Sequence, residues 1–219
     1  MFICSREICY NLAMAKDVFR GIKVTLPYAK IFRRLGYREG VSRLTPWEKD
    51  RYLKLIDEAF LLCDLKGVGE IYKAEITEKG IRVDQQFLWP SQSLKKYLGH
   101  TDEVLLLAAT AGEAIGKAIK DLALHNQLVE AAVYDATASE VVDESLSWLS
   151  EWFNEKLRRF GKALSPRRFS AGYGDFALEH QADFFEILGL ADLGISLNPS
   201  FMLVPEKSVT ALVAVEKIS

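Results

Sequence analysis

The chain has 219 residues, of which 49% are hydrophobic, so it is long enough to bury a sizeable core. Its formal net charge is −2, with acidic and basic residues interspersed along the sequence. A protein that binds a phosphate backbone needs a basic face, so this balance argues against a nucleic-acid partner. We expect one domain over residues 1–219. Within it, the sequence pattern says least about the structure of the N-terminal segment 1–45.

The cysteines and histidines show neither a metal-ligand pattern nor a disulfide pattern. The cysteines are odd in number and lack the spacing of a zinc site, and the histidines lie far apart in the sequence. These residues are Cys4, Cys9, Cys63, His100, His125 and His180. We therefore expect idle thiols, no disulfide framework and no zinc site.

The N-terminal stretch contains apolar residues between positions 2 and 12. Arg6, Glu7 and Asn11 interrupt it, and no small-residue cleavage site follows. No apolar run reaches the roughly 20 residues that a membrane-spanning helix needs. The sequence predicts neither a signal peptide nor a membrane helix, and we expect a cytoplasmic protein. Both Met1 and Met14 are compatible with the natural start.

The first well-defined element is a helix over residues 46–64. Thr45 and Glu48 form a capping box, with Pro46 at the first helical position. Apolar residues then recur at helical spacing, as in an amphipathic helix.

Two strands and a further helix are predicted in the middle of the chain. The alternating segments 71–77 and 81–88 flank Gly80 and predict a β-hairpin. A strongly apolar run over 103–109 predicts a buried strand, which Gly112 separates from a helical pattern.

The start of that helix has some likeness to a phosphate-binding loop. The spacing between Gly112 and Gly116 is one residue too short, and Ala118 stands where a magnesium-binding serine or threonine belongs. The sequence therefore argues against a nucleoside triphosphate.

The longest predicted helix covers residues 136–160. Its apolar residues recur at spacings of three and four and form a narrow stripe. They are Val142, Leu146, Leu149, Phe153, Leu157 and Phe160. At about 100° per residue, Asp143 lies at the border of this stripe, whereas Glu140 and Glu144 point away from it. Asp143 is therefore either a carboxylate facing a cleft or a solvated residue on the flank.

The C-terminal part is predicted to contain one helix and one hairpin. The helix begins at Asp175 and ends near Gly189. Its buried side consists of Leu178, Phe185 and Leu188. Strands over 201–204 and 209–215 form the hairpin. Strands and helices alternate without a regular βαβ order, which predicts an α+β fold with a mixed or antiparallel sheet packed against long helices.

The segment between the last two helices is the strongest candidate for a ligand site. Its sequence is Arg168-Phe169-Ser170-Ala171-Gly172-Tyr173-Gly174-Asp175. Arg168 supplies a guanidinium, the glycines around Tyr173 permit close backbone approach, and Asp175 can cap the following helix. This combination suits a zwitterionic, hydroxyl-bearing small molecule. An ordinary loop before a helix has a similar composition, so this segment alone leaves both interpretations open.

With this loop and residues 198–205, the chain resembles the activation domain of cobalamin-dependent methionine synthase, the module that binds S-adenosylmethionine. The family pattern is Arg-x-x-x-Gly-Tyr, then a helix, then a strand that contains Ser-Phe and ends in proline. The matching residues are Arg168, Gly172, Tyr173, Ser200, Phe201 and Pro205. Similar segments upstream are 106–112, 135–136 and 148–151. The best-matched core is 100–212, and a looser likeness extends back to the helix at 46.

The resemblance implies a role for each candidate site residue. Arg168 engages the carboxylate of S-adenosylmethionine, while backbone groups of Ser170, Gly172 and Tyr173 line the adenosine portion. The helix carboxylate of the family, a glutamate, falls at Asp143, whose side chain is one methylene shorter. Two flanking segments of the family domain that carry further ligand contacts have no match here, which indicates a shortened, freestanding version.

The implied function is reactivation of methionine synthase by reductive methylation of cob(II)alamin to methylcobalamin. Cobalamin would be carried by a partner, a methionine synthase that lacks its own activation domain, and an external electron donor would supply the electron. This chain would be an accessory component that positions the methyl donor.

Three other interpretations stay open. In the first, the chain is a non-catalytic adaptor that docks onto a corrinoid methyltransferase protein without delivering a methyl group. It could also reactivate a different corrinoid methyltransferase system. The plainest alternative is an α+β domain whose loop has lost its ligand.

Overall fold

A computed structural model describes residues 15–218 of the chain. Cys4, Cys9 and the apolar stretch between positions 2 and 12 lie outside the described residues. The strands are β1 (Asp17–Arg20), β2 (Lys66–Ile76), β3 (Ile81–Val83), β4 (Phe87–Trp89), β5 (Glu103–Thr110), β6 (Lys162–Leu164), β7 (Ser196–Leu197), β8 (Leu203–Val204) and β9 (Ser208–Lys217). The α-helices are α2 (Tyr28–Arg34), α3 (Pro46–Leu61), α4 (Gln92–Leu98), α5 (Glu113–Leu124), α6 (Leu128–Arg158) and α7 (Gln181–Leu188), and the 3₁₀ helices are η1 (Leu178–His180) and η2 (Leu190–Leu193).

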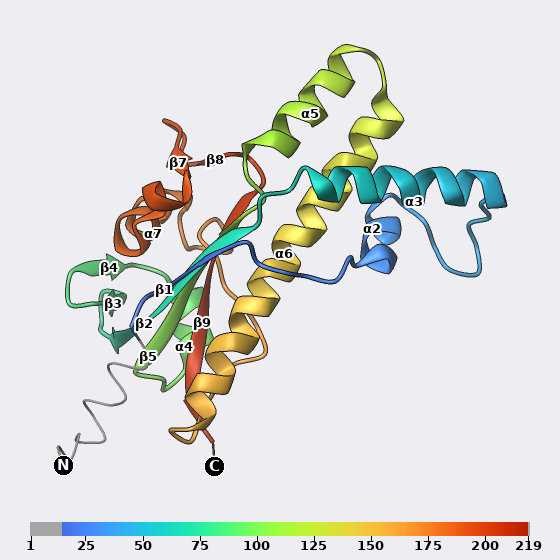
Figure 1. The fold of residues 1–219 in the computed structure, drawn as a ribbon. Helices are drawn as coiled ribbons and strands as arrows, with labels where there is room; N and C mark the ends of the chain where they lie inside the picture. The colour runs from blue at the N-terminus through green and yellow to red at the C-terminus, as the bar shows by residue number, and fades with distance from the viewer. Residues whose placement is uncertain (1–14, 219) are drawn as a thin grey trace, which may run out of the picture.

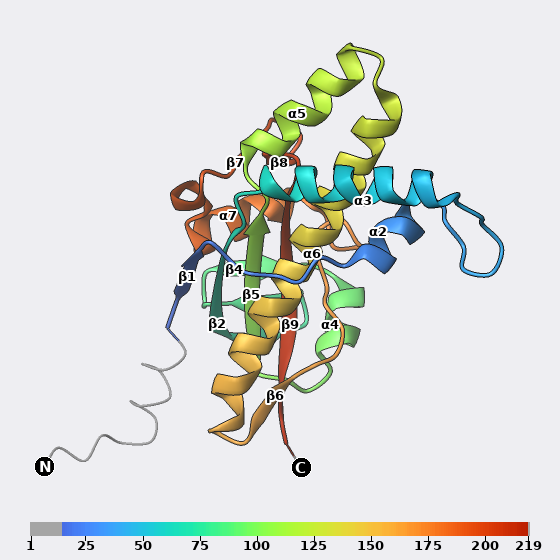
Figure 2. The same cartoon turned by 45° about the vertical axis from the view of Figure 1, so that its right-hand side comes forward.

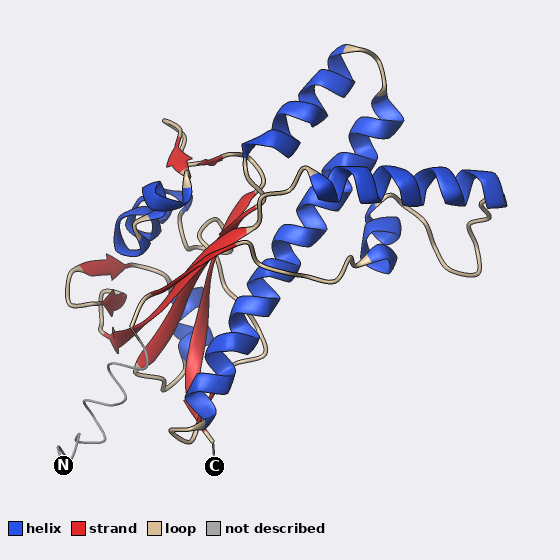
Figure 3. Ribbon diagram, in the orientation of Figure 1, coloured by secondary structure: helices blue, strands red, loops and turns tan. Residues whose placement is uncertain are grey.

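The main sheet has seven strands in the order β4-β3-β2-β5-β9-β6, with β1 also paired to β2. Every described pairing is antiparallel, including the separate small ladder of β7 and β8. The long helix α6 lies across the sheet, and helices α3 and α5 extend beyond one end of the sheet (Figures 1 and 3). The predicted α+β fold, with an antiparallel sheet packed against long helices, is confirmed.

The sheet is covered on both faces because its central strand β5 is apolar from Val104 to Ala109. All eight residues of β5 are buried. Leu106 and its alternate neighbours pack with α4 and α7, whereas Leu105 and Leu107 pack with α3, α5 and α6. Figure 2 shows α6 in front of the sheet and α4 behind it. The continuous apolar run of the sequence thus reflects a strand buried on both faces.

Two glycines of β2 let α6 approach the sheet closely. A Cβ atom added at Gly69 would lie 2.4 Å from Cε2 of Phe153, and one added at Gly67 would lie 2.8 Å from Cδ1 of Leu149. Both contacts are shorter than those that real Cβ atoms make, so a side chain at either position would force side chains of α6 to shift. The seating of α6 matters because this helix forms one wall of the candidate site.

The predicted helices are present with shifted ends. The capping box at Thr45 forms, and α3 ends at Leu61 rather than 64. Helix α6 starts at Leu128 rather than 136, because Val133 and Ala136 add a contact to α2 and α3 beyond the predicted stripe.

One predicted hairpin forms and the other does not. The hairpin around Gly80 is confirmed, because β2 pairs with β3. Its second strand, expected over 81–88, is divided into β3 and β4, because Asp84 and Gln85 adopt positive φ angles and form a turn. The hairpin expected between 201–204 and 209–215 does not form, since β8 pairs with β7 and β9 lies between β5 and β6. Strand β9 is buried on both faces, which favours the centre of the sheet over a hairpin at its edge.

The helix predicted to begin at Asp175 is also wrong at its start. Asp175 lies in a turn, and the 3₁₀ helix η1 precedes α7, which begins at Gln181. Of the expected buried side, Leu188 is buried and Phe185 half-buried, whereas Leu178 is exposed.

Candidate functional site

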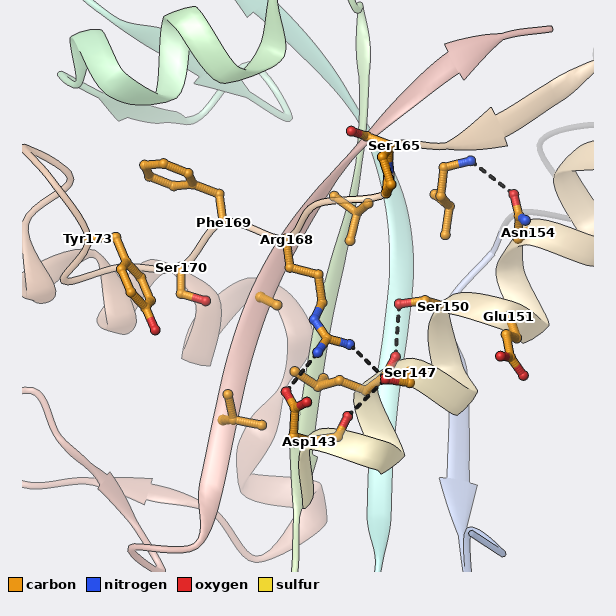
Figure 4. Close-up of a pocket in the computed structure, with 16 residues that line it drawn as sticks. Asp143, Ser147, Ser150, Glu151, Asn154, Ser165, Arg168, Phe169, Ser170 and Tyr173 are labelled. Carbon is orange, nitrogen blue, oxygen red and sulfur yellow. Dashed lines mark hydrogen bonds and ion pairs between the residues drawn. The ribbon is translucent and has the colours of Figure 1, made fainter. Parts of the chain in front are cut away.

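A groove lies between α6 and the segment 164–173, with β9 forming its floor. Its volume is about 870 Å³. The polar residues along it are Asp143, Ser147, Ser150, Glu151 and Asn154 from α6, and Ser165, Arg168, Ser170 and Tyr173 from the opposite segment. Figure 4 shows Arg168 reaching across this groove toward α6. Four of the five residues singled out in the sequence, all except Gly172, therefore line one groove.

Arg168 and Asp143 form an ion pair in this groove. Nη2 of Arg168 lies 2.7 Å from Oδ1 of Asp143, and Nη1 donates a hydrogen bond of 3.2 Å to Oγ of Ser147. Asp143 thus faces the groove, and its side chain is 47% exposed. The helical phase that placed Asp143 at the border of the apolar stripe accounts for this position.

Ser170 anchors the loop to the sheet. Its hydroxyl donates a hydrogen bond of 2.9 Å to the carbonyl of Thr210 in β9. Next to it, Phe169 forms a two-way backbone bridge with Leu212, with N···O distances of 2.9 and 2.7 Å. The loop therefore starts from a fixed position on β9.

Gly172 and Tyr173 form the turn of the loop. Gly172 has a φ of +91°, a conformation that favours glycine, and its N–H donates to the carbonyl of Phe176 at 2.7 Å. The Tyr173 carbonyl accepts from the N–H of Phe176 at 3.0 Å. The Tyr173 side chain is 65% exposed, so an aromatic face stands open beside the groove.

Asp175 caps a different helix from the one predicted. Its carboxylate accepts hydrogen bonds from the Ser91 hydroxyl at 2.6 Å and from the N–H groups of Gln92 and Ser93 at 2.7 and 3.1 Å. The hydroxyl of Ser91, followed by these N–H groups, holds the pKa of the Asp175 carboxyl well below its usual range. The loop 168–175, called the ligand loop below, is therefore joined to the start of α4.

Several lining residues were missed in the sequence although their spacing marks them. Ser147, Ser150 and Asn154 follow Asp143 within a sector of roughly 60° on α6. The side-chain oxygen of Asn154 accepts from the N–H of Leu164 at 2.9 Å, which ties α6 to the opposite wall. The Glu151 side chain forms no hydrogen bond or ion pair within residues 15–218.

The ionisable groups of the groove favour a cationic ligand. Asp143 and Glu151 contribute two carboxylates and Arg168 one guanidinium, which leaves a net charge of −1 among the lining side chains. A ligand with one net positive charge and its own carboxylate would match this arrangement.

Residues 15–218 contain neither a cluster of metal-ligating side chains nor a helix suited to span a membrane. Residues 15–218 contain no group of three His, Cys, Asp or Glu side chains that could hold a metal ion. Burial raises the pKa of the Cys63 thiol to about 12, so this thiol stays protonated at neutral pH. None of the described helices has both the length and the apolar character needed to cross a membrane.

Comparison with known proteins adds information at the level of the fold. No protein-family model matches the sequence, and no curated protein matches it. The structure is similar to the crystal structure of the MetH reactivation domain bound to AdoHcy, with a TM-score of 0.62 and 13% sequence identity. The similarity covers 94% of this chain and 80% of that chain. The chain therefore has the fold of the MetH reactivation domain.

Proposed function

We propose that this protein binds S-adenosylmethionine in the groove between α6 and residues 164–173, and that it positions the methyl donor for reactivation of a cobalamin-dependent methionine synthase. The observation that supports this most is that Arg168, Asp143 and the exposed Tyr173 line one open groove. It occurs on a fold similar to that of a domain solved with AdoHcy.

The charged end of the groove suits the amino-acid part of the ligand. Arg168 uses two of its five N–H donors on Asp143 and Ser147, so others are available to a carboxylate. The ligand's ammonium would bind Asp143, or Glu151 farther along α6. S-adenosylmethionine carries one net positive charge, which complements the net −1 of the lining side chains.

The loop suits the nucleoside part. The exposed ring of Tyr173 offers a face on which adenine can stack, and Ser170 keeps the adjacent backbone on β9. The groove thus contains a charged part, formed by Arg168 and the carboxylates of α6, and an aromatic part at Tyr173.

The protein's own contribution would be positioning. Cobalamin, carried by a partner methionine synthase that lacks its own activation domain, would supply the methyl-accepting chemistry after an external donor provides an electron. The residues of this chain would bind the two ends of the donor and hold its sulfonium in line for displacement. No general base is required for that task.

Calorimetric titration with S-adenosylmethionine tests ligand binding directly. We expect saturable binding by the wild type and a loss of about tenfold or more in Arg168→Ala, because a hydrogen bond to a charged group contributes about 1.5–3 kcal/mol. Arg167→Ala is the matched control, since Arg167 is exposed and does not line the groove. Equal binding by all three proteins would place the ligand elsewhere, and no binding by the wild type would contradict the proposal.

A second assay separates reactivation from an adaptor function. The adaptor alternative is favoured by one observation, namely that Arg168 already has a carboxylate partner in Asp143. Reactivation predicts that this protein, a reductant and S-adenosylmethionine restore turnover of an oxidatively inactivated, truncated methionine synthase. If the protein docks onto that synthase without restoring turnover, the adaptor function is correct.

A further inference from the structure

Helix α4 lies against the back of the ligand loop and contacts it at both ends. The helix covers only Gln92–Leu98, and its side chains Leu94 and Leu98 are buried in the core. One contact involves Asp175 at the end of the loop, and the other involves Tyr97 next to Arg168.

At the first contact, the loop completes the N-terminal cap of α4, which Ser91 begins. The Ser91 hydroxyl accepts from the N–H of Leu94 at 3.0 Å, which leaves the N–H groups of Gln92 and Ser93 for Asp175. The unpaired N–H groups of the first helical turn are thus satisfied jointly by residues more than 80 positions apart.

Gly174 brings the loop backbone close enough for this cap. Its φ is +59°, and an added Cβ would lie 2.9 Å from the Ser93 hydroxyl oxygen. Any side chain at this position would meet the start of α4. The second glycine of the Gly-Tyr-Gly turn therefore serves the contact with α4, whereas Gly172 serves the turn itself.

At the second contact, Tyr97 holds both neighbours of Arg168. Its hydroxyl donates to the carbonyl of Arg167, and its ring stacks on Phe169 with centroids 5.5 Å apart and planes at 26°. The Tyr97 oxygen also accepts from the N–H of Ala214 in β9 at 3.2 Å. One side chain of α4 therefore contacts the residues on both sides of Arg168.

We infer that Tyr97 and Asp175 are positioning residues: they clamp the two ends of the ligand loop onto α4 and so set the placement of Arg168 and Tyr173. Neither side chain lies in the groove lining, so each acts through the loop. The consequence for ligand binding rests on the proposed function, whereas the clamp itself does not.

Amide hydrogen exchange of the full-length protein tests the clamp without any ligand. We expect Tyr97→Phe and Asp175→Ala to speed exchange in residues 169–176 by about tenfold, with little change in the buried strand β5. Tyr52→Phe and Asp50→Asn are matched controls, because neither side chain makes a hydrogen bond in the described part of the chain, and they should leave both regions unchanged. Unchanged exchange in the loop, or an equal rise in β5, would overturn the inference.

Binding of AdoHcy tests the consequence for the site. We expect Tyr97→Phe and Asp175→Ala to weaken binding by about tenfold while the melting temperature stays within a few degrees of wild type. Asp175→Asn should retain part of the affinity, because its amide oxygen still accepts from an N–H group. If the wild type binds AdoHcy and these variants bind it equally well, Tyr97 and Asp175 do not position the site. If the wild type does not bind, the proposed function fails and the exchange experiment alone decides on the clamp.

Discussion

Replacing Gly69 by alanine tests how closely α6 is seated on the sheet. The added Cβ would lie 2.4 Å from Cε2 of Phe153 and 2.8 Å from Cδ2 of Leu107, and both neighbours are fully buried. Overpacking of this kind destabilises a protein by about 1–3 kcal/mol. For a protein of this size, that corresponds to a fall in melting temperature of roughly 2–12 °C.

Gly116 provides a control with the opposite sign. It lies within α5, and an added Cβ would meet nothing within 4 Å. Alanine in the middle of a helix is more stable than glycine by about 0.5–1 kcal/mol, so Gly116→Ala should raise the melting temperature. Comparing the two variants by thermal and urea unfolding separates steric conflict from backbone entropy.

A second substitution identifies the conflict with Phe153. Phe153→Leu removes the ring atoms nearest to the new methyl group, so the double variant should be more stable than the sum of the two single effects predicts. Strictly additive effects, or a Gly69→Ala variant as stable as wild type, would refute the close seating of α6 on β2.

Two further predictions concern the site and the loop. Ser147→Ala removes one hydrogen bond to Arg168 but leaves the pair with Asp143, so AdoHcy binding should weaken by roughly 2- to 10-fold in calorimetry, less than in Arg168→Ala. Because hydrogen bonds lower the folded-state pKa of Asp175, its contribution to stability is present above the unfolded value of 3.8 and is lost as pH falls through the folded pKa. The difference in free energy of unfolding between wild type and Asp175→Asn, measured with urea, should therefore be constant near neutral pH and should become smaller below pH 3.8. A difference that grows on acidification would contradict this reasoning.

The features predicted correctly are those that neighbouring residues specify. The capping box at Thr45 and the apolar run of β5 depend only on residues that are close together in the sequence, and both are present. The position of Asp143 depends only on helical phase. The same phase would have identified Ser147 and Asn154, four and eleven residues farther along α6, as groove residues.

The features predicted wrongly depend on contacts between distant segments. The sequence predicts that Asp175 caps the next helix, because local capping is the commoner arrangement, but its carboxylate binds the start of α4. The four-residue turn before β9 predicts a hairpin, yet the two apolar faces of this strand place it between β5 and β6. Local pattern cannot distinguish these alternatives, because it contains no information about which distant segment offers the better partner.

The exposure of the Arg168–Asp143 pair determines how the Arg168→Ala experiment can be interpreted. The two side chains are 28% and 47% exposed, and partly solvated ion pairs of this kind stabilise a fold by only about 0–1 kcal/mol. Breaking the pair by replacing Arg168 with alanine therefore costs the fold little. A large loss of affinity in a variant that unfolds at the wild-type temperature would consequently report on the groove as a binding site. A comparable loss of stability would instead show that the pair serves the fold.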